Sequence, residues 1–146
     1  ARVVAAHNAP VVVMHNRDKP DGTLDIMRDI TAFFERSLKI AAQAGIPASR
    51  IILDPGIGFG KDTRHNLLLL EALDELVGLG QAILVGVSRK SLIGELTGRP
   101  VDRRLAGSLA AALASVARGA RIVRVHDVAE TCDALKVWQA IDQAGG

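Results

Sequence analysis

The sequence predicts an α/β fold in which parallel strands alternate with helices, and three observations carry this prediction. Four short runs rich in Val, Ile and Leu are continuous rather than alternating with polar residues, as in strands covered on both faces. The intervals after them carry apolar residues three or four positions apart, which is the spacing of a helix with one buried face. Strand–helix alternation of this kind produces a parallel sheet. The four strand-like runs are residues 10–16, 50–56, 82–90 and 121–128.

The first interval predicts a helix that begins after Thr23 and ends before Gly45. Thr23 is a suitable N-cap, and Gly45 with Pro47 just beyond it is a typical helix stop. The apolar stripe of this helix comprises Met27, Ile30, Phe34, Leu38 and Ala41.

The later intervals contain a short helix and three more stripes. The short helix covers residues 91–96, directly after the third run. Cys132, the single cysteine, falls on the last stripe, so we expect it to be a core residue rather than a nucleophile. The three stripes are Leu67, Leu70, Leu73 and Val77 after Thr63; Leu105, Leu109, Leu113 and Val116 before Gly119; and Val128, Cys132, Leu135, Trp138 and Ile141.

Two architectures fit these units: an open doubly wound sheet, or part of a (β/α)₈ barrel. A complete barrel needs eight strands and about 250 residues, whereas this chain has 146 residues and supplies four strands. Periodicity alone does not separate the two architectures. No linker or low-complexity stretch interrupts the chain, so residues 1–146 are predicted to form one domain.

The composition argues against several classes of function. A net charge of +2 and an aromatic content of 3% do not suit a nucleic-acid-binding protein. No apolar run approaches the roughly 18 residues that a membrane-spanning helix needs. The single cysteine cannot form an internal disulfide and fits a reducing compartment, so we expect a cytoplasmic protein. The four histidines show no zinc-ligand spacing, and His15 is interpreted as a structural residue.

Polar residues gather at the C-terminal end of every strand-like run. The first run ends in residues 15–17, and the second ends in Asp54, which the loop 55–61 follows. The third run ends in residues 88–91, and the fourth carries residues 124–127. Parallel α/β folds place their ligands at the edge where the strands end. The sequence therefore predicts a ligand site assembled from four repeats.

Arg124 and His126 are the most informative pair, because alternate residues of a strand face the same side. A guanidinium and an imidazole on a buried face are costly unless an anion or another partner meets them. Either the strand is an exposed edge with a solvated pair, or the pair faces a binding site. Asp127 is predicted to be the N-cap of the last helix rather than a catalytic acid.

The remaining candidates each have a structural and a functional interpretation. Asp54 is either a turn former or an acid that receives two N–H groups of a heterocycle in bidentate fashion. The glycines of GIGFGK let the backbone approach a ligand, with Phe59 as an apolar wall. Their spacing is not that of a dinucleotide fingerprint, and no Ser or Thr follows Lys61 as a P-loop requires. Ser88 and Lys90 would share a face, and their segment precedes a helix N-terminus, which attracts anions.

Four motifs in this order resemble the dihydropteroate synthase family: VVVMHNRD at 11–18, ILDPGIGFGK at 52–61, LVGVSRKSLIG at 84–94 and IVRVHDV at 122–128. The resemblance covers essentially the whole chain. It implies a TIM (β/α)₈ barrel of which this chain supplies the C-terminal four strands, with the N-terminal half outside the sequence. It also implies a transferase of folate biosynthesis. Such an enzyme joins p-aminobenzoate to a dihydropterin methyl pyrophosphate and releases pyrophosphate with the help of Mg²⁺.

The resemblance further implies a role for each site residue. Asp54 would accept hydrogen bonds from the amino and ring N–H groups of the pterin, and Lys90 would reach its carbonyl and ring nitrogen. Arg124 would stack on the pterin and, with His126, hold the leaving pyrophosphate. The implied catalytic residues are thus Lys90, Arg124 and His126; the others are Phe59 and Ser91 at the p-aminobenzoate site, and Gly86 and Met14 as pocket lining.

The chain departs from the family pattern in two ways. It has MHNRD at 14–18 where the family commonly has MHM-x-G, and it lacks the motifs of the family's first half. The Mg²⁺ ligands are expected in that half, so no metal ligand is assigned on this chain. Because four βα units leave two open sheet edges, we expect the chain to pair as a homodimer or with its missing half, and to be inactive alone.

Two other functions stay open at this point. One is a non-catalytic half-barrel that binds a pterin or an anion. The other is the pterin-binding domain of a methyltetrahydrofolate-dependent methyltransferase. The segment 88–91 and the Arg124–His126 pair argue against the methyltransferase, because that chemistry releases no pyrophosphate.

Overall fold

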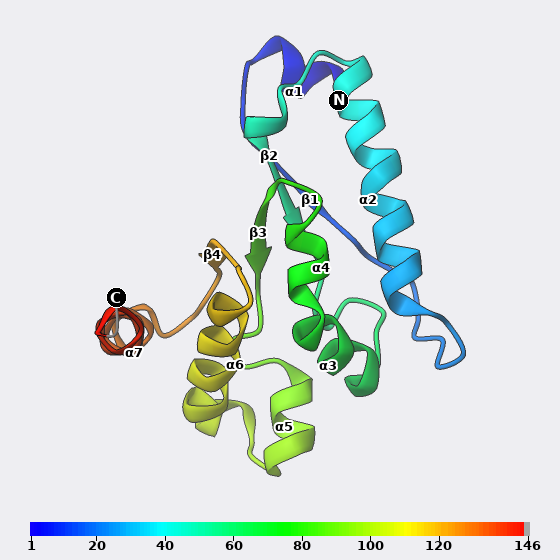
Figure 1. The fold of residues 1–146 in the computed structure, drawn as a ribbon. Helices are drawn as coiled ribbons and strands as arrows, with labels where there is room; N and C mark the ends of the chain where they lie inside the picture. The colour runs from blue at the N-terminus through cyan, green and yellow to red at the C-terminus, as the bar shows by residue number, and fades with distance from the viewer. Residues whose placement is uncertain (145–146) are drawn as a thin grey trace.

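The fold is a four-stranded parallel sheet whose strands alternate with helices along the chain, which confirms the predicted fold class. The computed structural model describes residues 1–144, and its strands follow chain order across the sheet (Figure 1). In the register of the sheet, Met14 lies beside Asp54 and Val85 lies beside Val123. The strands are β1 (Val11–Met14), β2 (Ile51–Asp54), β3 (Ala82–Val85) and β4 (Ile122–Val123).

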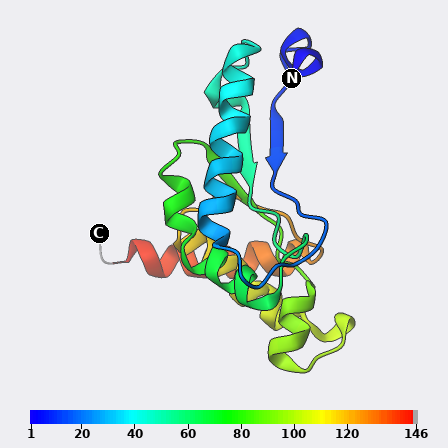
Figure 2. The same ribbon diagram turned by 90° about the vertical axis from the view of Figure 1, so that its right-hand side faces the viewer.

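Helices occupy every interval between strands. The long helix α2 runs alongside the strands, and α7 lies across the direction of α2 (Figure 2). No helix within residues 1–144 is long and apolar enough to cross a membrane. The α-helices are α1 (Arg2–Ala6), α2 (Ile26–Gln43), α3 (Thr63–Glu71), α4 (Leu73–Val77), α5 (Ser91–Thr97), α6 (Leu105–Ala117) and α7 (Val128–Gln143), with 3₁₀ turns at Ala48–Arg50 and Val101–Arg103.

The core lies around the two central strands. Strands β2 and β3 are buried along most of their length, whereas the edge strands β1 and β4 are partly exposed. Val12 of β1, for example, is 45% exposed. A continuous apolar run therefore predicts burial well for the two central strands and less well for the edge strands. The core side chains with no measurable exposure are Ile30, Phe34, Leu53, Leu69, Leu73, Leu76, Ile83, Val85 and Val87.

Helix α2 ends as predicted but begins later. Asp25, not Thr23, is its N-cap, because an Asp25 side-chain oxygen accepts a hydrogen bond of 3.1 Å from the backbone N–H of Arg28. The Thr23 hydroxyl instead donates to the Asp21 carboxylate at 2.7 Å. Gly45 follows the last helical turn with φ +76°.

The second predicted stripe is right for Leu73, which is fully buried, and for Leu70 and Val77, which pack partly buried against the core, but it is wrong for Leu67. The interval contains two helices, α3 and α4, which meet at Ala72, and Leu67 on the predicted stripe is 40% exposed. The polar side chains His65 and Asn66 take buried positions instead. The buried face comprises His65, Asn66, Leu69, Leu73 and Leu76.

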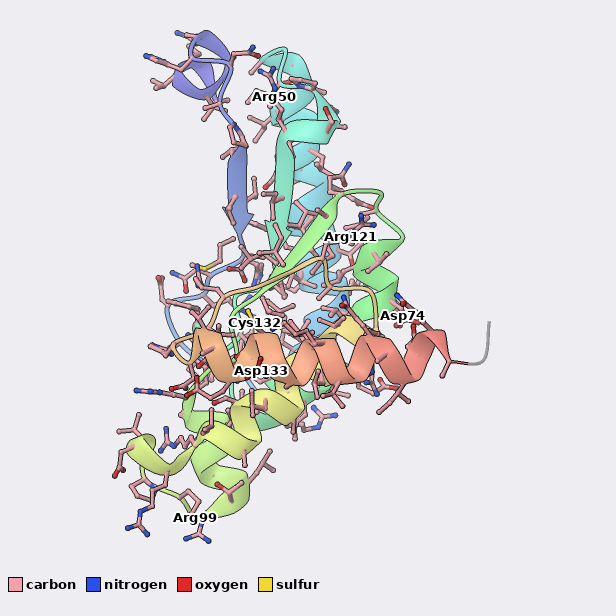
Figure 3. The ribbon with its side chains drawn as sticks, turned by 90° about the vertical axis from the view of Figure 1, so that its left-hand side faces the viewer. Arg50, Asp74, Arg99, Arg121, Cys132 and Asp133 are labelled. Atoms are coloured by element: carbon pink, nitrogen blue, oxygen red, sulfur yellow. The ribbon has the colours of Figure 1, made fainter. Side chains whose placement is uncertain are left out.

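Helices α6 and α7 also bury faces that the apolar stripes do not predict. The buried residues of α6 are small ones, Ser108, Ala112 and Ser115, and both serine hydroxyls donate to carbonyls four residues earlier in the helix. On α7 only Thr131 is buried, and Cys132 is exposed (Figure 3), so the prediction of a core cysteine is wrong. Helix α7 packs against α6 and leaves most of its apolar stripe uncovered.

Candidate ligand-binding site

The segments that follow β2, β3 and β4 meet beyond the carboxyl ends of the strands. A pocket of about 240 Å³ lies there, between the segments that follow β3 and β4. Asp54, the last residue of β2, lies next to it through its contact with Arg124. The pocket is lined by Gly86, Ser88, Lys90, Arg124, Val125 and His126.

Asp54 is a buried carboxylate with two partners. It is 1% exposed, and its Oδ1 accepts a hydrogen bond of 2.8 Å from the backbone N–H of Gly56. Its Oδ2 lies 3.4 Å from a terminal guanidinium nitrogen of Arg124. Because each carboxylate oxygen can accept two hydrogen bonds, Asp54 keeps acceptor capacity for a ligand.

Arg124 and His126 reach the pocket from beyond the strand, not from its face. Strand β4 ends at Val123, so the predicted strand 121–128 and its same-face argument are wrong. The backbone N–H of Arg124 still donates to the carbonyl of Val85 at 2.9 Å. His126 is held by Ser88, whose hydroxyl lies 3.2 Å from the backbone nitrogen of His126 and 3.0 Å from its ring Nδ1. The pair therefore lines one pocket because β3 anchors Arg124 and the segment after β3 anchors His126.

Lys90 lies beside an aromatic ring. Its Nζ is 4.2 Å from the centroid of the Phe59 ring, which comes from the loop after β2. Partial burial lowers the pKa of Lys90, the positive charge of Arg124 lowers it further, and the Asp54 carboxylate partly offsets both. Lys90 thus lines the pocket with an ammonium that feels both the cation Arg124 and the anion Asp54.

The segment 88–91 is not an extension of β3. Arg89 has φ +58°, and this turn breaks the strand geometry that would place Ser88 and Lys90 on one face. Both nevertheless line the pocket, Ser88 buried and Lys90 half-buried. The prediction that Ser88 and Lys90 share a strand face is wrong, although both residues line the same pocket.

This segment is held by Ser108 of α6 and by Arg104, the N-cap residue of that helix, and the sequence alone points to neither. The Ser108 hydroxyl accepts a hydrogen bond of 2.9 Å from the backbone N–H of Arg89. The Arg104 guanidinium donates to the carbonyls of Arg89 and Lys90 at 3.0 and 3.3 Å. Neither residue belongs to a recognisable motif, because their partners are backbone groups far away in the chain.

Asp127 occupies the predicted N-cap position of α7, but its side chain does not cap the helix. Its carboxylate pairs with the guanidinium of Arg89 at 2.5 and 3.2 Å. This pair ties the segment after β3 to the start of α7. The hydrogen bonds and charge of Arg89 lower the pKa of Asp127.

The other predicted site residues lie around the pocket. Gly86 is buried in its wall, and a Cβ on it would lie 2.9 Å from the Arg124 guanidinium, so a side chain there would require Arg124 to move. Met14, at the end of β1, pairs in register with Asp54. Ser91 is exposed at the start of α5. Met14, Phe59 and Ser91 do not line the 240 Å³ pocket itself.

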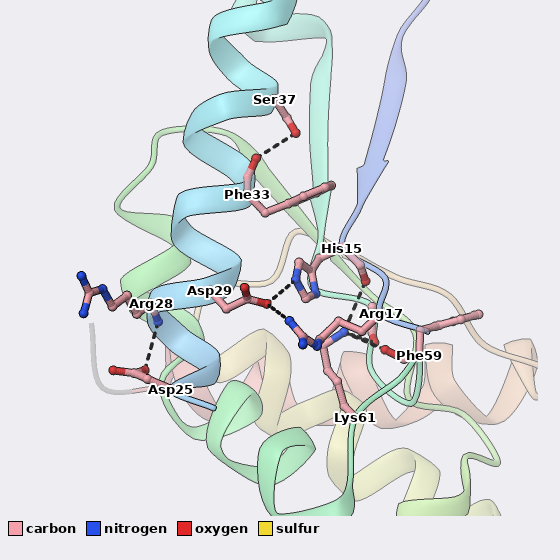
Figure 4. A network of polar contacts seen from close by, with 10 residues as sticks. His15, Arg17, Asp25, Arg28, Asp29, Phe33, Ser37, Phe59 and Lys61 are labelled. Atoms are coloured by element: carbon pink, nitrogen blue, oxygen red, sulfur yellow. Dashed lines mark hydrogen bonds and ion pairs between the residues drawn. The ribbon is translucent and has the colours of Figure 1, made fainter. Parts of the chain in front are cut away.

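A second polar network lies behind the loop that carries Phe59 (Figure 4). His15 is buried, its Nε2 lies 3.1 Å from the Asp29 carboxylate, and its Nδ1 has no hydrogen-bond partner. Arg17 donates to the same carboxylate oxygen at 2.8 Å. Burial lowers the pKa of His15, the Lys61 ammonium lowers it further, and the Asp29 carboxylate acts in the opposite direction.

The residues around the pocket do not fit a magnesium ion. Mg²⁺ prefers octahedral oxygen ligands, whereas Lys90 and Arg124 bring positive charge, and Asp54 is already paired with Gly56 and Arg124. Within residues 1–144, no group of three or more His, Cys, Asp or Glu side chains is placed to hold a metal ion.

Comparison with known protein families identifies relatives of this chain. The family described as pterin binding enzyme matches residues 1–126. The dihydropteroate synthase of Haemophilus influenzae is 43% identical over 141 residues, which are 92% of this chain and 51% of that protein. The dihydropteroate synthase of Bacillus subtilis is 39% identical over 146 residues, 100% of this chain and 51% of that protein. The chain thus spans about half the length of these curated relatives.

Solved structures show the same similarity. Dihydropteroate synthase from Stenotrophomonas maltophilia, with imidazole bound in its active site, superposes with a TM-score of 0.94 at 43% identity; the match covers 98% of this chain and 57% of that one. The Xanthomonas albilineans enzyme in complex with 7,8-dihydropteroate gives a TM-score of 0.92 at 46% identity, over 97% of this chain and 53% of that one.

The lowered pKa of His15 predicts a loss of stability in mild acid. The unfolded chain binds a proton at His15 more readily than the folded chain does, so the free energy of unfolding falls as the pH falls below about 6.5. We expect His15→Gln to reduce this slope between pH 7 and pH 5, measured by urea unfolding. Equal slopes for the wild type and His15→Gln would contradict the assignment.

Proposed function

The chain belongs to the family of pterin-binding enzymes, and we propose that it forms the C-terminal half of a dihydropteroate synthase barrel. The reaction would condense p-aminobenzoate with a dihydropterin methyl pyrophosphate, in folate biosynthesis. One observation carries the proposal: a buried acid, Asp54, and two cations, Lys90 and Arg124, meet at the carboxyl edge of the sheet. The identities of 39% and 43% to enzymes of this name support it.

Asp54 and Lys90 would recognise the pterin. The amino and ring N–H groups of a pterin form a flat donor edge that suits a carboxylate, and Asp54 is held in place by the Gly56 N–H. Lys90 would donate to the carbonyl and ring nitrogen of the same ring. Arg124 would stack on the ring, which requires its guanidinium to leave Asp54.

Arg124 and His126 would bind the pyrophosphate that leaves. The C–O bond of the pterin CH₂ group breaks with the electron pair going to pyrophosphate, and the electron-rich ring stabilises the cationic carbon. The aniline nitrogen of p-aminobenzoate then forms the C–N bond and loses a proton. Cations already placed where the negative charge develops lower the barrier to this step. Holding both substrates in the orientation in which they react lowers the barrier further.

Phe59 and Ser91 would form the p-aminobenzoate side, and Gly86 and Met14 would line the pocket. Phe59 already stands next to Lys90, with its ring 4.2 Å from the ammonium. Because the residues of this chain do not fit Mg²⁺, we assign no step to the metal ion. Its ligands would lie in the part of the family's barrel that this chain does not span. We propose a cytoplasmic location, which the single cysteine supports.

Replacement of Lys90 tests the pterin site. Lys90→Ala removes a charged donor, and such hydrogen bonds are worth about 1.5–3 kcal/mol, so we expect pteroic acid to bind about 10-fold to 100-fold more weakly. Isothermal titration calorimetry on the purified chain measures this, with circular dichroism as the check on folding. Lys39→Ala on the exposed side of α2 is the matched control and should bind as the wild type does.

Two results of this titration would contradict the proposal. Equal affinity of Lys90→Ala and the wild type would mean that the pterin binds elsewhere. A wild-type chain that shows no binding of pteroic acid would remove the pterin site altogether. Because the chain alone is expected to be inactive, the assay of pyrophosphate release uses its complex with a chain that supplies the other half of the barrel. Binding without pyrophosphate release by that complex, when both substrates are supplied, would favour a non-catalytic binding module over a synthase.

The open sheet edges predict association. Strands β1 and β4 have one hydrogen-bonded neighbour each within the described residues, and exposed strand edges pair with other chains. We propose that the chain forms a homodimer, or pairs with a chain that supplies the other half of the barrel. Light scattering on the chain purified alone should give twice 15.4 kDa, and Val12→Lys on edge strand β1 should weaken the association. A monodisperse species of 15.4 kDa would contradict the homodimer.

A further inference from the structure

Lys61 closes the GIGFGK loop with an ammonium that is bonded only to backbone carbonyls. The residue is 6% exposed. Its Nζ donates to the carbonyl of Gly56 at 2.9 Å, of Phe59 at 3.1 Å and of His15 at 3.3 Å. A lysine has three donors, so these carbonyls use its full capacity.

The three carbonyls come from two different segments of the chain. His15 follows β1, whereas Gly56 and Phe59 belong to the loop after β2 (Figure 4). The two backbones touch at Gly56, which has φ +67°, and a Cβ there would lie 1.9 Å from the His15 carbonyl oxygen. Lys61 therefore bridges two segments that are already in contact.

Asn66 of α3 supports the same loop from the other side. Its Oδ1 accepts a hydrogen bond of 2.8 Å from the backbone N–H of Gly58, and its Nδ2 donates to the Lys61 carbonyl at 3.3 Å. The Phe59 N–H closes the turn onto the Gly56 carbonyl at 3.0 Å. The loop conformation is thus set by polar contacts at its base and middle.

The fixed loop presents one wall to Lys90. The Phe59 ring lies 4.2 Å from the Lys90 ammonium, and a Cβ on Gly58 would lie 3.3 Å from the Lys90 side-chain carbons. Movement of the loop would therefore alter both the ring contact and the packing of Lys90.

We propose that Lys61 is a positioning residue, whose ammonium fixes the loop 55–60 so that Phe59 and Lys90 are held together as one wall of the ligand site. It acts through the loop and does not touch the ligand. The claim that this wall binds a ligand rests on the proposed function, whereas the claim that Lys61 holds the wall does not.

A lysine occupies this position although a buried charge is costly, because its ammonium donates to three backbone carbonyls. Burial lowers the pKa of Lys61 to about 8; the Asp54 and Asp29 carboxylates oppose this shift, and the Arg17 guanidinium adds to it. The buried His15 ring also feels the Lys61 charge. A methionine would fill the same space without this cost, but it could not donate to any of the three carbonyls.

The test compares Lys61→Met with Lys39→Met, which removes an exposed lysine from α2. In protein labelled with ¹³C-lysine, the Phe59 ring should shift the side-chain protons of Lys90 upfield in the wild type and in Lys39→Met. We expect this shift to disappear in folded Lys61→Met, and pteroic acid to bind it at least 5-fold more weakly by calorimetry.

The outcomes separate the inference from the proposed function. A folded Lys61→Met that keeps the Lys90 shift would overturn the inference, and so would a lost shift with unchanged affinity for pteroic acid. A wild-type chain that does not bind pteroic acid would sink the proposed function, while the Lys90 shift would still decide whether Lys61 holds the wall.

If Lys61→Met does not fold, the wild type can be titrated from pH 6.5 to pH 9.5. The amides of Ile57 and Gly60 directly follow two of the accepting carbonyls. Their resonances should shift with the same midpoint as the Lys61 side-chain carbon, near pH 8. Amide resonances that stay constant while Lys61 titrates would overturn the inference.

Discussion

The candidate site depends on one constraint: the buried carboxylate of Asp54 at the end of a central strand has to be satisfied. A buried charge without partners is strongly destabilising, and here the Gly56 N–H and the Arg124 guanidinium meet it. The first contact turns the chain sharply after β2 and so starts the loop that carries Phe59. The second draws the segment after β4 towards β2, across the pocket.

The residues around Asp54 carry more positive charge than one carboxylate balances. Lys90 and Lys61 both sense Asp54, and Arg124 pairs with it. The Lys61 ammonium donates hydrogen bonds to carbonyl oxygens of the loop, whereas Lys90 and Arg124 line the open pocket. The exposed excess suits an anionic ligand such as pyrophosphate, while the acid suits the donor edge of a heterocycle. The same residues thus offer contacts both for a heterocycle and for an anion, which the proposed function requires.

The sequence predicts the fold class and the gathering of polar residues, because continuous apolar runs and strand ends are local features. It does not predict where β4 ends: Arg124 leaves the strand because its partner is Asp54, and His126 because its partner is Ser88, both distant in the chain. The sequence does not predict the position of Lys61 either, since its partners are backbone carbonyls without a sequence signature. The buried small-residue face of α6 and the exposed Cys132 escape the hydrophobic pattern, because packing partners rather than periodicity decide them.

A crystal structure of the chain with pteroic acid and pyrophosphate would test the central claim most directly. The account predicts the pterin with its amino and ring N–H groups on the Asp54 carboxylate, its carbonyl near Lys90, and Arg124 moved away from Asp54 to contact the pyrophosphate together with His126. A structure in which Arg124 keeps its contact with Asp54, and the pterin lies outside the carboxyl edge of the sheet, would contradict it.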